Sequence, residues 1–366
     1  MRLPFARSLS PIGLDLGAHT IKAVQFENKS HAARLVASCC LPRKSPGSPV
    51  DRDELSRLAA GLARQGFIGG EVVLAMPASK TLTSVLELPA RSSELPMDEI
   101  ACAEFCRIHK TEPHAITMAY WDLPHSTRAS RSTFAMSAGW LSSEAEQFLD
   151  MVQDAGLTVV AVDVNSSATA RTAGPSSPGN MDMTGILDLG WTSAVASIVR
   201  SGTLIYERRI PEAGLIHLVN SFLTDASIDR RDAQYLIEQV GMKDSPQPQS
   251  GDADIDADCR AKISAHCVKM DDEIRQALSY ACHQYPDDQA PGLLLAGGGA
   301  CIPELAPFLQ KQLRMQVRVA DPLAAMSCAP EQKGKVNASM LTAIGLARFG
   351  CEMLATHSGS RQQVTA

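Results

Sequence analysis

The chain contains no apolar run long enough to cross a membrane as a helix, and residues 1–11 lack the apolar core of a secretion signal. Its net charge is −6 and it has no stripe of basic residues, which argues against a nucleic-acid-binding protein. Residues 356–366 are polar without an amphipathic pattern, so we expect a disordered tail there and no membrane-anchoring helix. These absences predict a cytoplasmic protein with no membrane contact of its own.

Paired metal-binding cysteines are also missing. The ten cysteines are scattered and include no Cys-x-x-Cys pair, so reduced core cysteines are expected in place of disulfides or a zinc site. A length of 366 residues suffices for two domains. The 45% apolar and 20% charged content is ordinary for a globular protein.

One pattern occurs twice, far apart in the chain. Residues 12–17 and 185–190 are each a short apolar run that ends in Asp-Leu-Gly. Small or hydroxylated residues and a second strand-like run follow each of them. A duplicated strand–turn–strand unit with Asp-x-Gly in its first turn predicts two facing hairpins that grip phosphate.

The first turn offers several groups to a phosphate chain. Asp15, at the end of a buried strand, can hold Mg²⁺ through water, and Lys22 can add a positive charge. Gly17 permits a tight turn. That turn can direct three backbone amides at phosphate oxygens, those of Ala18, His19 and Thr20. Taken alone, either hairpin fits an ordinary turn equally well.

The second turn and a third segment complete the expected site. Asp188 is a second candidate for Mg²⁺ through water, and it is followed by Gly190, Trp191 and Thr192. A buried strand then leads into a bare backbone on which an adenine or a ribose could lie, formed by Gly297, Gly298 and Gly299, with Ile302 next to it. The three elements together predict a nucleotide site in a cleft between two lobes.

The intervening segments suggest an insertion. Residues 81–162 read as strand, helix, two strands, helix and strand, which predicts a split βαβ unit. We expect a first lobe from residues 1–80 and 163–180, with 338–355 packing back on it, and a second lobe from residues 181–337. Residues 243–258 are rich in Pro, Ser and Asp and almost free of apolar residues, which predicts a mobile surface loop.

These motifs carry a resemblance to a known superfamily. Residues 15–22, 188–192 and 296–299 resemble the two phosphate loops and the adenosine loop of the actin/Hsp70/hexokinase superfamily. The insertion is similar to the subdomain of its FtsA and PilM branch. Residues 86–89, 155–164 and 343–347 resemble the PilM family of type IV pilus assembly. The resemblance implies an α/β fold of the actin-like, ribonuclease H-like type.

The same resemblance implies ATP and Mg²⁺ as ligands. It also implies docking of the N-terminal cytoplasmic tail of a single-span inner-membrane partner, PilN in the pilus system, beside the insertion. The protein would then be recruited to the inner face of the cytoplasmic membrane through that partner, with self-association as a further expectation.

Some positions depart from the family pattern. Gln234 and Ile237 stand where relatives carry an acidic residue and a lysine beside the base. Asn165 stands where hydrolysing relatives use Gln or Glu to position water, and an asparagine cannot act as a base. Asp163 could act in its place or could cap the following helix. With Asp15, Asp163, Asn165 and Asp188 as the catalytic candidates, we expect slow ATP hydrolysis or none.

Three other functions remain open at this point. A filament-forming ATPase like FtsA is one, although a terminal amphipathic helix is missing. A small-molecule kinase of the sugar-kinase type would need an aspartate base in a substrate pocket. A degenerate actin-like scaffold without nucleotide is compatible with the departures from the family pattern.

Overall fold

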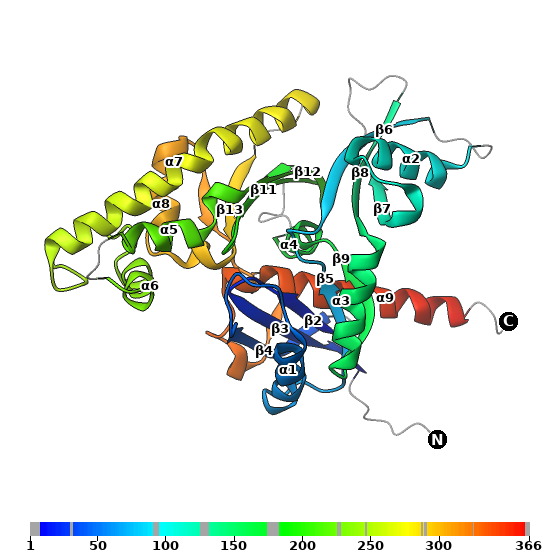
Figure 1. Cartoon of the computed structure of the whole chain (residues 1–366), viewed down its shortest axis with the longest axis horizontal. Helices are drawn as coiled ribbons and strands as arrows, with labels where there is room; N and C mark the ends of the chain where they lie inside the picture. The colour runs from blue at the N-terminus through cyan, green and yellow to red at the C-terminus, as the bar shows by residue number, and fades with distance from the viewer. Residues whose placement is uncertain are drawn as a thin grey trace. The chain divides into compact units, whose positions relative to one another are not determined.

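The computed structural model describes residues 8–29, 32–90, 95–124, 132–173, 183–224, 228–245, 247–286, 288, 291–324 and 326–362. The chain divides into two compact units, coloured by residue number in Figure 1. The first unit comprises Met1–Gly174, Pro322–Val336 and Met340–Ala366. The second comprises Pro175–Asp321 and Asn337–Ser339. The predicted break at residues 174–180 lies outside the described residues.

The first unit is built on a seven-stranded mixed sheet with the order β15-β4-β3-β2-β5-β9, in which β1 pairs with β3. Its strands are β1 (Ser8–Leu9), β2 (Ile12–Leu16), β3 (Thr20–Lys29), β4 (Ala32–Pro42), β5 (Glu71–Ala75), β9 (Thr158–Asp163) and β15 (Ser327–Cys328). Strands β2, β3 and β4 are antiparallel, whereas β2, β5 and β9 are parallel.

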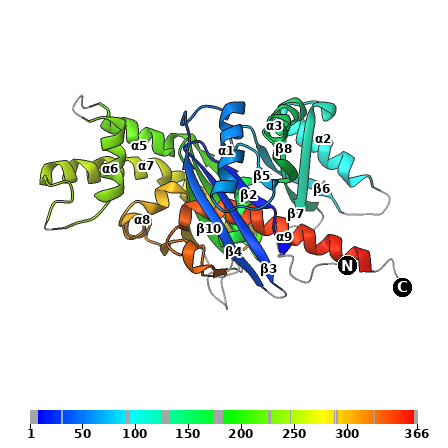
Figure 2. The ribbon, with the colours of Figure 1, turned by 90° about the horizontal axis from the view of Figure 1, so that it is seen from below.

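Helices cover both faces of this sheet. Successive side chains of a strand point to opposite faces, so each face of β2 has its own helical partners. Ile12, Leu14 and Leu16 of β2 belong to the core under α1 (Arg52–Arg64) and α3 (Ser142–Asp154). The opposite face of β2 lies against α9 (Leu341–Gln362), as Figure 2 shows. At Gly13 a Cβ atom would lie 2.1 Å from the carbonyl oxygen of Ala343, so only glycine permits this close approach of helix and strand.

The segment between β5 and β9 forms a smaller, three-stranded antiparallel sheet with the order β6-β8-β7. It comprises β6 (Leu82–Pro89), α2 (Met97–His109), the 3₁₀ turn η1 (Pro113–Ala115), β7 (Ile116–Asp122) and β8 (Ser132–Leu141). The element order agrees with the sequence prediction, but the pairing of the last strand does not. Strand β9 pairs with β5 of the large sheet, so the expected split βαβ unit lacks its fourth strand.

The second unit contains a five-stranded sheet with the order β12-β11-β10-β13-β14. Its strands are β10 (Met183–Leu189), β11 (Ala194–Arg200), β12 (Thr203–Ile210), β13 (Gly292–Ala296) and β14 (Val317–Val319). Its helices and 3₁₀ turns are η2 (Pro211–Ala213), α5 (Leu215–Phe222), α6 (Arg230–Gln239), α7 (Ala253–Gln284), η3 (Gly298–Cys301) and α8 (Leu305–Leu313). Helix α7 packs on β11 and β12.

The prediction of a mobile loop over residues 243–258 is wrong for residues 253–258, which are helical. Helix α7 begins at Ala253 because the side chain of Asp252 caps it, accepting the backbone amides of Asp254 and Ile255. Asp256 is buried and accepts the amides of Gln249 and Ser250, which ties the preceding segment to the helix.

Two further boundaries differ from the sequence prediction. Segment 322–336 belongs to the first unit, because β15 pairs with β4 and the side chain of Ser38 donates to that of Gln332 at 2.7 Å. Helix α9, preceded by the 3₁₀ turn η5 (Ala338–Met340), continues to Gln362. The tail predicted to be disordered, residues 356–366, is therefore helical as far as Gln362. Residues 363–366 lie outside the described residues.

Candidate functional site

The first Asp-x-Gly turn joins β2 to β3 at the carboxyl end of β2. Asp15 is paired with Lys22 across the hairpin, and the Asp15 Oδ2 atom lies 3.1 Å from the Lys22 Nζ atom. Both side chains are largely buried, with 13% and 11% of their surfaces exposed. A Cβ atom on Gly17 would lie 2.6 Å from the Thr20 carbonyl oxygen, so the tight turn requires glycine.

The backbone carbonyl groups of residues 17–19 in this turn all accept hydrogen bonds from segment 43–48. The Gly17 oxygen accepts from the Arg43 Nη1 atom at 3.2 Å, the Ala18 oxygen from the Gly47 amide at 2.7 Å, and the His19 oxygen from the Arg43 amide at 3.0 Å. In a trans peptide the C=O and the following N–H point in opposite directions. The amides of residues 18–20 therefore point away from segment 43–48, in the arrangement that binds anions.

Arg43 is the anchor of the first loop. It is buried, and its Nε atom donates to the Glu54 Oε2 atom at 2.8 Å while Nη2 donates to the Ser48 carbonyl at 3.0 Å. Glu54 lies in the first turn of α1, whose N-cap Asp51 accepts the Glu54 amide. The loop is thus fixed to the beginning of α1. Sequence reasoning missed Arg43. The one signal that points to it is the Asp51-x-x-Glu54 spacing, which is typical of the start of a helix.

Asp163 ends β9 at the same edge of the sheet as Asp15. Leu14 pairs with Leu74, and Ala75 pairs with Asp163, so the two aspartates lie two strands apart, about 10 Å. This is the carboxyl edge of three parallel strands, where ligands bind in open α/β sheets. The N-terminus of α9 points toward this edge, because Ala343 contacts Gly13 whereas Gly350 contacts Pro11, so the helix runs antiparallel to β2.

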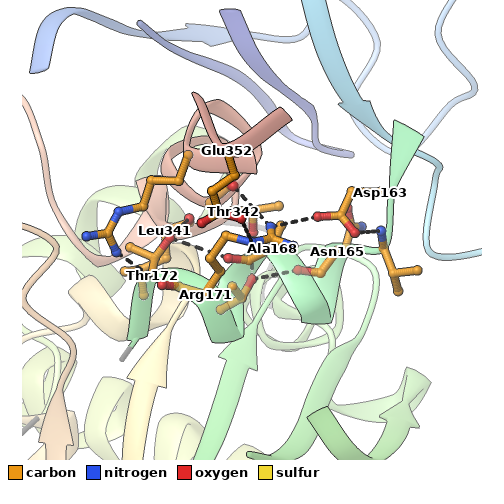
Figure 3. A network of polar contacts seen from close by, with 12 residues as sticks. Asp163, Asn165, Ala168, Arg171, Thr172, Leu341, Thr342 and Glu352 are labelled. Atoms are coloured by element: carbon orange, nitrogen blue, oxygen red, sulfur yellow. Dashed lines mark hydrogen bonds and ion pairs between the residues drawn. The ribbon is translucent and has the colours of Figure 1, made fainter. Parts of the chain in front are cut away.

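The carboxylate of Asp163 is engaged by neighbouring groups, as Figure 3 shows. Its Oδ2 atom lies 2.8 Å from the Arg171 Nη1 atom, and its Oδ1 atom accepts the Val164 amide at 2.8 Å. Arg171 also donates to the Gly345 carbonyl at 3.1 Å and lies over the ring of Phe349. These contacts join β9, α4 (Asn165–Ala173) and α9, and they make Asp163 the ion-pair partner of Arg171 in the last turn of α4.

Asn165 begins α4 directly after this ion pair. Its side-chain oxygen Oδ1 is buried and has no hydrogen-bond partner among the described residues. Its backbone carbonyl accepts from the hydroxyl of Thr169, which lies 2.9 Å from the hydroxyl of Thr342 in α9. Because Thr169 donates to a carbonyl, Thr342 must donate to Thr169. Asn165 thus presents one fixed, buried acceptor at the edge that carries Asp15.

The second Asp-x-Gly turn repeats the construction of the first. Asp188 and Leu189 end β10, and a Cβ atom on Gly190 would lie 2.8 Å from the Ser193 carbonyl oxygen. The Gly190 carbonyl accepts the amide of Leu215 at 3.0 Å, and the Trp191 carbonyl accepts that of Ile216 at 2.9 Å. The amides of Trp191 and Thr192 therefore point away from the start of α5.

The glycine-rich segment adjoins this turn within the second unit. Asp188 pairs with Ala296, and a Cβ atom on Gly297 would lie 2.1 Å from the Asp188 Oδ1 atom. Gly297 adopts φ +76°, and Gly299 packs on Leu189. Gly298 is exposed, and the nearest atom to its missing Cβ is Leu215 Cδ1 at 3.8 Å. The segment offers a bare backbone beside the second loop.

Three apolar residues near the candidate site are buried in the core. Trp191 and Ile302 are each 8% exposed, and Ile237 of α6 is 7% exposed. Trp191 and Ile302 therefore contribute their backbones, not their side chains, to any contact with a ligand. Gln234 lies on α6 with Ile237 and is half-buried.

Each unit thus gathers its own set of predicted site residues. The first unit brings together Asp15, the 17–20 turn, Lys22, Asp163 and Asn165, and the second brings together Asp188, the 190–192 turn and the 297–299 segment. The structure describes no cluster of three or more His, Cys, Asp or Glu side chains that could hold a metal ion by themselves. Nor does it describe a helix that is both long and apolar enough to cross a membrane.

Comparison with known proteins places the chain in a family. The family "Type IV pilus assembly protein PilM" matches residues 13–349. A solved PilM–PilN type IV pilus biogenesis complex is similar, with a TM-score of 0.73, 19% identity, and coverage of 95% of this chain and 99% of that chain.

More distant solved structures share the fold. MreB 5 of Spiroplasma citri bound to AMPPNP has a TM-score of 0.58 and 13% identity, covering 98% of this chain and 100% of that chain. The ethanolamine utilization protein EutJ of Carboxydothermus hydrogenoformans has a TM-score of 0.52 and 14% identity, covering 94% and 91%. No curated protein matches the chain. The chain has the actin-like ATPase fold, and it belongs to the PilM family of type IV pilus assembly proteins.

Proposed function

We propose that the chain is an ATP-binding adaptor of a type IV pilus or a related envelope machine. The observation that carries this proposal is the shared construction of the two Asp-x-Gly turns. In each turn, the carbonyl groups of the glycine and of the next residue accept hydrogen bonds from a neighbouring segment of the chain. The backbone amides that follow these carbonyls therefore point the other way, toward one side of the turn. Each such turn can hold phosphate oxygens of a bound nucleotide.

The donor set fits a magnesium nucleotide. Mg²⁺ is usually bound by one or two carboxylates, several waters and the phosphates themselves. Asp15 and Asp188 each supply one carboxylate beside a phosphate-binding turn, and Lys22 supplies a positive charge. The N-terminus of α9 adds the positive end of a helix dipole at the edge that carries Asp15. The bare backbone of 297–299 would receive the ribose or the base.

We infer slow hydrolysis or none. Asp163 is engaged by Arg171 and the Val164 amide, so it is a poor candidate for the base. The side-chain amide of Asn165 cannot take a proton from water. Nucleotide would then act mainly as a ligand that stabilises the bound conformation by mass action.

The partner we propose is the N-terminal cytoplasmic tail of a PilN-like single-span membrane protein. Membership of the PilM family and similarity to a solved PilM–PilN complex support this choice. The small sheet leaves β6 and β7 at its edges, where an extended peptide can add a strand. Binding of this tail would hold a cytoplasmic protein at the inner face of the membrane.

Calorimetric titration with ATP and Mg²⁺ tests nucleotide binding. The wild type should give saturable heats, and the double variant Asp15→Asn/Asp188→Asn should lose them, since the Asp15 carboxylate adjoins Gly17 and the Asp188 carboxylate adjoins Gly297. Asp150→Asn, which removes an exposed carboxylate on α3, is the matched control and should bind normally. Unchanged heats in the double variant would contradict the proposed site.

Fluorescence anisotropy with a labelled tail peptide tests the partner. The peptide is the N-terminal cytoplasmic segment of a PilN-like single-span protein from the same organism, and its binding is measured with and without ATP and Mg²⁺. A scrambled peptide of equal composition is the control. Equal binding of both peptides would argue for a different partner.

A further inference from the structure

A histidine lies within the buried stripe of α7. The stripe contains Ile263, Cys267 and Met270, and His266 lies among them with 5% of its surface exposed. The His266 Nε2 atom lies 3.1 Å from the carbonyl oxygen of Ala213. A carbonyl can only accept, so Nε2 carries the hydrogen and Nδ1 is the unprotonated nitrogen. That Nδ1 atom is buried and has no partner among the described residues.

Ala213 connects directly to the second Asp-x-Gly turn. It ends η2 and is followed by Gly214, where a Cβ atom would lie 2.5 Å from the Thr192 carbonyl carbon. The next two amides, of Leu215 and Ile216, donate to the carbonyls of that turn. His266, η2, the start of α5 and the turn therefore form one continuous set of contacts.

The protonation state of His266 suits a fixed donor. Burial lowers its pKa to about 4, and the nearby charges of Lys269 and His217 act in the same direction. The ring is neutral at neutral pH, so a single N–H is available and Ala213 receives it. A histidine that served only to fill the core would leave both nitrogens in apolar surroundings, which is unfavourable compared with an aliphatic side chain.

We propose that His266 is a positioning residue for the second Asp-x-Gly turn. Its Nε2–H fixes Ala213, and through Gly214 and the first amides of α5 it sets the direction in which the Trp191 and Thr192 amides point. The consequence for nucleotide affinity rests on the proposed function, whereas the effect on the turn itself does not.

The test compares two polar substitutions that differ by one methylene. His266→Gln can place an amide donor where Nε2 stands, whereas the donor of His266→Asn stops short of Ala213. Hydrogen exchange is followed without nucleotide at the amides of Leu215 and Ile216. We expect exchange to rise about tenfold in His266→Asn and to stay near the wild type in His266→Gln.

Ile274→Ala is the control for loss of packing alone. Ile274 is buried on the same face of α7 and is 1% exposed. This variant should raise exchange across the second unit without singling out these two amides. If His266→Asn behaves like Ile274→Ala, or if His266→Gln behaves like His266→Asn, the positioning role is wrong.

Titration of the same variants with ATP and Mg²⁺ separates the two proposals. His266→Asn should bind several-fold more weakly than His266→Gln. If the wild type binds no nucleotide, the proposed function fails, and the exchange experiment still decides the role of His266. If the exchange pattern holds but both variants bind nucleotide equally, the link from His266 to the phosphates is refuted.

Discussion

Replacing Gly345 by alanine should separate α4 and α9, the two helices that pack together beside Asp163. A Cβ atom at this position would lie 1.8 Å from the Ala168 carbonyl oxygen and 2.5 Å from its carbon. Both are backbone atoms, so relief requires α4 and α9 to move apart. The movement would stretch the contacts between Thr169 and Thr342, between Thr172 and Leu341, and between Arg171 and Gly345 itself.

The expected loss of stability follows from these contacts. Overpacking costs about 1–3 kcal/mol, and each weakened hydrogen bond costs about 0.5–1.5 kcal/mol. Alanine in place of glycine in a helix returns about 1 kcal/mol. The free energy of unfolding should therefore fall by roughly 2–6 kcal/mol, which is a large part of the 5–15 kcal/mol typical of a domain.

Urea denaturation followed by circular dichroism measures this change, with Gly61→Ala as the matched control. Gly61 also lies in a helix, α1, but no atom lies within 4 Å of its would-be Cβ. That variant should gain about 0.5–1 kcal/mol. Hydrogen exchange should locate the loss caused by Gly345→Ala in α4 and α9. Equal shifts of the two variants in the same direction would refute the reasoning.

Three further predictions concern the loops and pH. Gly297→Ala should abolish ATP binding in a titration because its Cβ would displace the carboxylate of Asp188, whereas Gly61→Ala, whose Cβ meets no atom within 4 Å, should bind normally. Arg43→Lys keeps a charge but loses the fork that holds the first turn, so thermal unfolding should show a loss of about 1–3 kcal/mol; an unchanged melting temperature would contradict this. Burial lowers the pKa of His266 from 6.5 to about 4, so the unfolded chain binds the proton first. Stability measured by urea denaturation should consequently fall by up to roughly 3 kcal/mol between about pH 7 and pH 4, and His266→Gln should flatten this dependence.

The local patterns of the sequence were sufficient for the hairpins. Each Asp-x-Gly turn lies between strands that pair within a few residues of it, so its geometry depends on neighbours in the chain. The two helices expected in residues 81–162 were also predictable from apolar periodicity, and the family resemblance supplied the actin-like fold.

The groups that hold those hairpins in place could not be predicted in this way. Arg43 reaches Gly17 across 26 residues, His266 reaches Ala213 across 53, and Arg171 reaches Gly345 across 174. A single sequence carries no signal for such distant pairs beyond a polar residue on an apolar stripe. The pairing of β9 with β5 was missed for a related reason. Apolar periodicity identifies a strand but does not show which other strand pairs with it.

The order of elements in the first unit has a consequence during synthesis. Helix α9 is the last element, yet it supplies Ala343, Ile344 and Ala347 to the core that includes Val24 and Phe26 of β3, near the start of the chain. A nascent chain on the ribosome must therefore keep that face of β3 uncovered until α9 has been synthesised. The second unit is almost continuous in sequence and can fold earlier, which reverses the usual N-to-C order and leaves an apolar strand surface for chaperones to shield.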